Sequence, residues 1–116
     1  MQRDVRAYLY DSCIAAGLIV EFLGKSTLED YRNNALLKSA VERQFEILGE
    51  ACNQLAKLDP QQAEQIPNLR RIVDFRNVLA HAYAVVDDAL VWGAATGSIP
   101  SLQRQLKEQL SKLDGR

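Results

Sequence analysis

Apolar side chains return every three or four positions along nearly the whole chain, which is the spacing of one face of an α-helix. One such series runs through residues 5–20 and another through 99–113. No stretch of useful length alternates between apolar and polar residues in the manner of a half-buried strand. The chain must therefore bury its apolar surface by packing helix against helix. We predict an all-α, up-and-down bundle of four to five helices in one domain over 1–116.

Capping and helix-breaking residues divide this pattern into separate helices. Gly24 is expected to end the first helix, and Ser26 with Glu29 has capping-box spacing for the start of a long second helix. Asp59 followed by Pro60 predicts the start of a short helix. The expected helices cover about 2–23, 26–57, 60–65, 68–80, a weaker helix that begins near 87, and 98–113.

Composition excludes several classes of protein. Hydrophobic residues make up 47% and charged residues 25% of the chain, which is a globular and not a disordered balance. The net charge of −1 argues against a protein that coats nucleic acid, although it is compatible with a local basic patch. The longest uncharged run, 89–103, is shorter than a membrane-spanning helix, and the N-terminus lacks an apolar signal core. We expect a cytoplasmic protein.

Cysteine and histidine are too few for a zinc site. Cys13 and Cys52 lie in apolar helical contexts, and the chain has one histidine, so one chain cannot supply the usual four ligands. We expect both cysteines to be reduced core residues and predict neither a disulfide, a metal nor a cofactor.

Segment 70–83 differs from the rest of the chain. It contains the only histidine, His81, and it places Arg70, Arg71 and Arg76 within seven residues of a mildly acidic sequence. An arginine fork suits phosphate oxygens, and an imidazole exchanges a proton near neutral pH. Arg70 and Arg71 could extend a positive rim that guides an RNA backbone, or could belong to a charged helix face.

Helical spacing relates the remaining polar residues of this segment. Asn77 and His81 are four residues apart and share a face, whereas Arg76 and Tyr83 are seven apart and share the neighbouring face if the helix continues. Arg76 and His81 are about 140° apart on an ideal helix. They converge only if the helix loosens near His81, or if a second chain supplies half of a cleft.

These side chains are the ones that metal-free RNA cleavage needs. A base removes the 2′-OH proton, an acid protonates the 5′-oxygen, and a cation offsets charge on phosphorus. One chain has a single histidine for the two proton transfers. A two-fold dimer with His81 at its seam would supply two histidines and two copies of Arg76, so we predict a homodimer.

The segment Arg76-Asn77-Val78-Leu79-Ala80-His81 resembles the R-x4-6-H motif of HEPN domains. Extended through Tyr83, it resembles the R-x4-H-x-Y form of HepT-like toxins. The resemblance covers roughly 5–110 and includes flanking sequences around 40–43, 48–51, 91–92 and 99–102.

The resemblance implies an HEPN-like, metal-independent endoribonuclease that is the toxin of a type VII-like toxin–antitoxin pair. It implies that Arg76 and His81 are catalytic, with Asn77, Arg70 and Arg71 as supporting or phosphate-binding residues. The implied partner is an MntA-like minimal nucleotidyltransferase, which can transfer AMP to the motif tyrosine, here Tyr83. An AMP there would place charge and bulk beside the residues that receive RNA phosphate.

One position departs from the family pattern. Asp74 stands where a glycine is frequent, two residues before the motif arginine. An acid there could pair with Arg70, Arg71 or a partner chain, or weaken the binding of RNA.

Other interpretations remain open. His81 could be a histidine at a helix C-terminus, Arg76 a surface ion-pair residue, Tyr83 a core or interface aromatic and Asn77 a solvated position. The glutamates Glu42, Glu46 and Glu50 could form a solvated face, a docking strip for the antitoxin, or a source of one carboxylate that orients His81 or Arg76.

Two other functions compete with the toxin hypothesis. The chain could be a non-catalytic HEPN interaction module that dimerises and binds a nucleotidyltransferase. It could also be the regulatory half of a nucleotidyltransferase complex that binds nucleotides. The sequence has no glycine-rich phosphate loop, which makes nucleotide binding by this chain alone a poor hypothesis.

Overall fold

The computed structural model describes residues 4–80 and 87–115, and within them it contains helices and no strand. The helices are α1 (Val5–Leu23), α2 (Leu28–Arg32), α3 (Ala35–Leu58), α4 (Pro60–Glu64), α5 (Leu69–Ala80), α6 (Asp88–Thr96) and α7 (Ser98–Asp114). Of these described helices, α2 and α4 have five residues each, and the other five have nine or more. The predicted all-α fold is confirmed.

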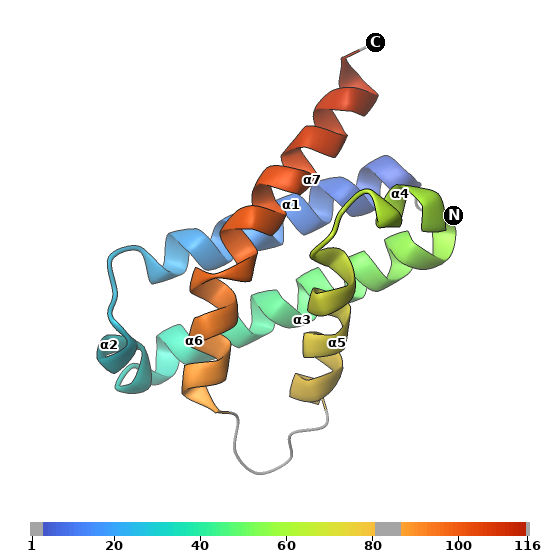
Figure 1. Cartoon of the computed structure of the whole chain (residues 1–116). Helices are drawn as coiled ribbons and strands as arrows, with labels where there is room; N and C mark the ends of the chain where they lie inside the picture. Colours follow the sequence, from blue (N-terminus) through green and yellow to red (C-terminus); the bar gives the residue numbers. More distant parts are fainter. Residues whose placement is uncertain (1–3, 81–86, 116) are drawn as a thin grey trace.

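Helix α3 is the element against which most of the others pack. Figure 1 shows α1 lying along it, α5 crossing it and α7 crossing α1. α6 leads into α7 and also contacts α2. The side chains buried between these helices are mainly aliphatic because each helix turns one apolar face inward. The largest fully buried ones are Leu9, Ile19, Tyr31, Val41, Phe45, Leu48, Leu55, Ile66, Ile72, Ile99, Leu102 and Leu106.

The long second helix expected over 26–57 is instead two helices. The capping box is formed by Thr27 with Asp30, and not by Ser26 with Glu29, and it opens the short α2. The Asn34 side chain then accepts a hydrogen bond from the Leu37 N–H at 3.0 Å and starts α3 as a new N-cap. Asparagine favours that position because its side chain satisfies an N–H that the helix leaves without a partner.

The bend between α2 and α3 carries an aromatic side chain into the core. Tyr31, in α2, is fully buried, and its ring centroid lies 6.0 Å from that of Trp92 in α6. Burial is the main cause that raises the pKa of its hydroxyl, and the nearby Glu42 and Asp88 carboxylates add to it. The break between α2 and α3 therefore accompanies the burial of this ring against α6.

Both cysteines are free thiols, and of the two expected core residues Cys52 is buried whereas Cys13 is only partly buried. Cys52 is fully buried and lies 3.7 Å from the Ser12 hydroxyl, to which it donates a weak hydrogen bond. Burial raises the pKa of the Cys52 thiol to about 12, so the unreactive thiol form prevails at neutral pH.

Glycine is required at the end of α1. Gly24 has a φ of 49° and a ψ of −120°, which side-chain-bearing residues rarely adopt, and its N–H donates to the Val20 carbonyl at 3.0 Å. We expect Gly24→Ala to lower the free energy of unfolding by about 1–2 kcal/mol. Urea denaturation of the purified protein measures this.

The matched control is Gly93→Ala in α6. A Cβ at Gly93 meets no atom within 4 Å and its φ is not positive, so alanine should raise stability by about 0.5–1 kcal/mol. Equal effects of the two substitutions would contradict the conformational argument for Gly24.

Candidate functional site

Helix α5 approaches α3 closely where Arg76 lies on Gly49. A Cβ added to Gly49 would overlap the Cβ of Arg76 and lie 2.5 Å from its Cγ. No other residue type fits there without a shift of α5, because the atoms that it would meet belong to the first part of the arginine side chain. The edge-to-face pair of Phe45 and Phe75, with ring centroids 5.0 Å apart, holds the same two helices together nearby. The backbone of α3 therefore guides the stem of Arg76.

The guanidinium of Arg76 ends on a carboxylate of α3. Nη2 of Arg76 lies 2.9 Å from Oε2 of Glu50, and Nε2 of Gln54 donates to Oε1 of the same carboxylate at 2.8 Å. Glu50 and Gln54 are four residues apart and share one face of α3. Both oxygens of Glu50 thus have a donor, and the ion pair is the contact expected if a glutamate orients Arg76.

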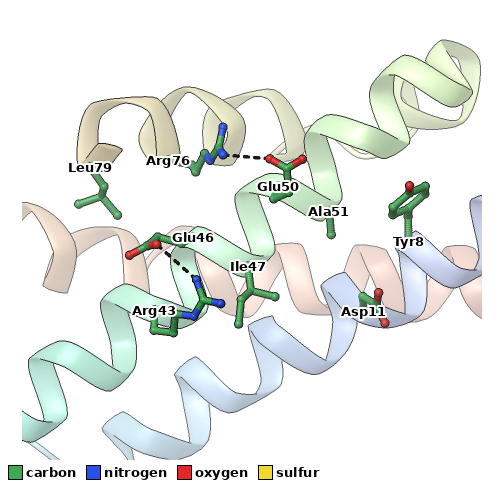
Figure 2. Close-up of a pocket in the computed structure, with 9 residues that line it drawn as sticks. All are labelled: Tyr8, Asp11, Arg43, Glu46, Ile47, Glu50, Ala51, Arg76 and Leu79. Carbon is green, nitrogen blue, oxygen red and sulfur yellow. Dashed lines mark hydrogen bonds and ion pairs between the residues drawn. The ribbon is translucent and has the colours of Figure 1, made fainter. Parts of the chain in front are cut away.

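This pair lies in an open groove of about 810 Å³ between α1, α3 and α5. Figure 2 shows Arg76 and Leu79 on α5 at one side of the α3 residues that line the groove, and Tyr8 and Asp11 on α1 at the other. The figure also shows that α5 and α3 run in opposite directions here. The full lining is Tyr8, Asp11, Arg43, Glu46, Ile47, Glu50, Ala51, Arg76 and Leu79.

The groove has a second cation, Arg43, two turns before Glu50. Its Nη1 lies 3.5 Å from Oε2 of Glu46, and both side chains are more than half exposed. Glu42 is not in the groove: burial raises its pKa, and so do Asp88 and Glu46, while Lys38 opposes them. The three evenly spaced glutamates therefore have three different surroundings.

The structure places the other described candidate residues away from this groove. Arg70, Arg71 and Asn77 are exposed on α5 and do not line it. Arg70 borders a smaller hollow beside α4, and Arg71 borders one beside α6. Asp74 is exposed, and among the described residues no ion pair joins it to Arg70 or Arg71.

His81 and Tyr83 lie outside the described residues. The last residues described before them are Leu79, which lines the groove, and Ala80, which ends α5. The sequence prediction for the Arg76–His81 pair and for Tyr83 thus stays a prediction.

Several groove residues carried little signal in the sequence. Gly49 and Glu50 belong to the flank that supported the family resemblance, but nothing in their order showed that they meet Arg76. Tyr8 and Asp11 come from α1, more than sixty positions before Arg76. A helical period identifies one face of one helix and does not identify the helix opposite.

Residues 4–80 and 87–115 contain neither a group of side chains that could hold a metal ion nor a membrane-spanning helix. No group of three or more histidine, cysteine or acidic side chains there is arranged to hold a metal ion. None of the helices in those stretches is both long enough and apolar enough to cross a lipid bilayer.

Comparison with known proteins gives consistent matches. The family model described as "Ribonuclease HepT-like" matches residues 13–109. Over 108 residues the chain is 31% identical to "Putative RNase MJ1380" of Methanocaldococcus jannaschii, covering 91% of this chain and 96% of that protein. It is 34% identical over 112 residues to "Probable ribonuclease HepT" of Thermococcus cleftensis, covering 93% and 97% respectively. No solved structure gives a significant match.

Because α5 approaches α3 so closely at Gly49, one added methyl group there should lower the stability of the fold. Gly49→Ala should lower the free energy of unfolding by about 1–2 kcal/mol, because overpacking outweighs the better helix propensity of alanine. Urea denaturation measures the change, with Gly93→Ala as the control for glycine-to-alanine effects in an open helix position. A Gly49→Ala protein as stable as Gly93→Ala would show that α5 can move away at no cost.

Proposed function

Because the chain belongs to the ribonuclease HepT-like family, we propose that it is an endoribonuclease toxin that cleaves RNA without a metal ion. The observation that carries the proposal is the position of Arg76. It is held at an open groove five residues before the histidine of the R-x4-H-x-Y motif. A strand of RNA could enter this groove with a phosphate on the exposed side of the guanidinium.

In the proposed reaction the RNA 2′-oxygen attacks the adjacent phosphorus while the bond from phosphorus to the 5′-oxygen breaks. An imidazole of His81 takes the 2′-OH proton, and an imidazolium returns a proton to the leaving 5′-oxygen. Arg76 offsets the charge that develops on the phosphoryl oxygens. The products are a 2′,3′-cyclic phosphate and a 5′-hydroxyl.

The two proton transfers are the reason for proposing a homodimer. The chain has one histidine, so a single subunit would need another group for the second transfer. A two-fold axis beside the end of α5 would bring two copies of His81 and Arg76 into one cleft. Asn77, Arg70 and Arg71 are exposed on the same helix, where they can contact RNA or the second subunit.

The proposed antitoxin is an MntA-like minimal nucleotidyltransferase acting in a type VII-like system. The phenolic oxygen of Tyr83 would attack the α-phosphorus of ATP, pyrophosphate would leave, and the phenolic proton would pass to a base of the antitoxin. AMP on Tyr83 would then repel RNA phosphate from Arg76 and His81, which are close in sequence.

A second candidate function has one observation in its favour. The groove is lined by three carboxylates, those of Asp11, Glu46 and Glu50, against two guanidinium groups, those of Arg43 and Arg76. That balance is unfavourable for a polyanion and suits a non-catalytic module that binds a nucleotidyltransferase. The intact Arg76 and His81 favour the nuclease, and activity separates the two.

RNA cleavage in EDTA tests the mechanism directly. The wild type should cut RNA and leave cyclic-phosphate ends, and His81→Ala should abolish cutting because proton transfer is lost. Arg76→Ala should slow it about 10²–10³-fold, as loss of one transition-state charge donor does. The control is Arg104→Ala, which removes an arginine of α7 that donates a hydrogen bond to Ser101 on the surface. Substantial activity in His81→Ala, or an active monomer in sedimentation, would contradict the proposal.

Co-expression with the proposed antitoxin, an MntA-like nucleotidyltransferase, tests the role of Tyr83. Wild-type protein expressed with an MntA-like nucleotidyltransferase should gain the mass of AMP and lose ribonuclease activity. Tyr83→Phe should gain no mass, because it lacks the accepting oxygen. Modification of Tyr83→Phe to the wild-type extent would place the acceptor elsewhere.

A further inference from the structure

We infer that Glu50, held by Gln54, is a positioning residue that sets the direction of the Arg76 guanidinium for phosphate. The inference rests on the proposed function, since it concerns the same arginine. Its basis is the linked set of contacts from Gln54 to Glu50 to Arg76, at 2.8 and 2.9 Å.

Glu50 has a partner on its own helix in addition to Arg76. Gln54 follows it by one turn of α3, and its amide N–H occupies Oε1, which leaves Oε2 directed to Nη2 of Arg76. Glu50 is also adjacent to Gly49, on whose backbone the stem of Arg76 rests. The arginine side chain is thus constrained at both ends, by packing near Cβ and by a carboxylate at the guanidinium.

The ion pair leaves Arg76 able to bind an anion. A guanidinium has five N–H donors, and the contact with Glu50 uses one of those on Nη2. The Arg76 side chain is 32% exposed and lines the groove, so it is accessible to an anion there. Phosphate can therefore bind without breaking the contact to Glu50, which makes the carboxylate a support and not a competitor.

An ordinary surface ion pair would have a different consequence. Pairs this exposed contribute little to stability, so loss of Glu50 should hardly change the urea midpoint of unfolding. Positioning acts on the transition state, where a misplacement of about 1 Å costs about 10²-fold in rate. The expected signature is a large effect on kcat beside a small effect on stability.

The kinetic test compares three variants on one RNA. Glu50→Ala should lower kcat about 10–100-fold and leave KM within about threefold, because the guanidinium becomes free to turn. Glu50→Gln should stay within about fivefold of wild type, since an amide oxygen can still accept from Arg76. Gln54→Ala should lower kcat a few-fold. Glu108→Ala, which removes an exposed carboxylate of α7 paired with Lys112, is the control for charge.

The double variant Glu50→Ala with Arg76→Ala separates positioning from other roles. It should be no slower than Arg76→Ala alone, because Glu50 acts through that side chain. An additive loss would overturn the inference, and so would a rise in kcat/KM for Glu50→Ala, which would mark Glu50 as a competitor of phosphate.

A measurement without RNA keeps the inference separate from the proposed function. In nitrogen-15 spectra of arginine side chains, the Arg76 Nη signals should be split by slow rotation in the wild type and averaged in Glu50→Ala. Identical spectra would overturn positioning even if the protein cleaves RNA. Split signals in an inactive wild type would overturn the nuclease and leave the contact intact.

Discussion

The packing of α5 on α3 at Gly49 is the contact on which the groove depends. Without a side chain at this crossing, the two helices approach until the stem of Arg76 lies on the backbone of α3. The Phe45–Phe75 pair and the buried Ile72 and Val73 hold α5 in that register. Because α3 also packs on α1, one long helix forms the floor of the groove and supports both of its sides.

The same helix, α3, also supplies the carboxylates that pair with the two arginines of the groove. Glu46 and Glu50 are four residues apart on α3, and each contacts an arginine, one from its own helix and one from α5. In the proposed reaction, the two carboxylates would weaken the long-range attraction of both guanidinium groups for RNA. By holding each guanidinium in place, they would favour its contact with a phosphate. Under the proposed function, this groove would recognise one phosphate locally and would not attract a polyanion broadly, in keeping with the net charge of −1.

Local rules worked where a helix end is decided by neighbouring residues. Gly24 and Asp59 end or cap helices as their positions predicted, and α6 starts at the N-cap Asp87, near the expected position. The same local rules did not predict the break between α2 and α3, in the segment 26–35, where the sequence offers more than one capping position. Burial of Tyr31 against Trp92 favours the arrangement with a break before Asn34, and that contact joins residues about sixty positions apart.

The sequence by itself determined the all-α class, most helix bounds and the segment with the R-x4-H-x-Y pattern, because each depends on spacing within one helix. Only the tertiary structure decided that Arg76 faces Glu50, that Gly49 is the crossing point, and that Arg70 and Arg71 point away from this groove. Helical periodicity identifies which side chains share a face. Which face meets which is decided by burying the apolar surface of all the helices together.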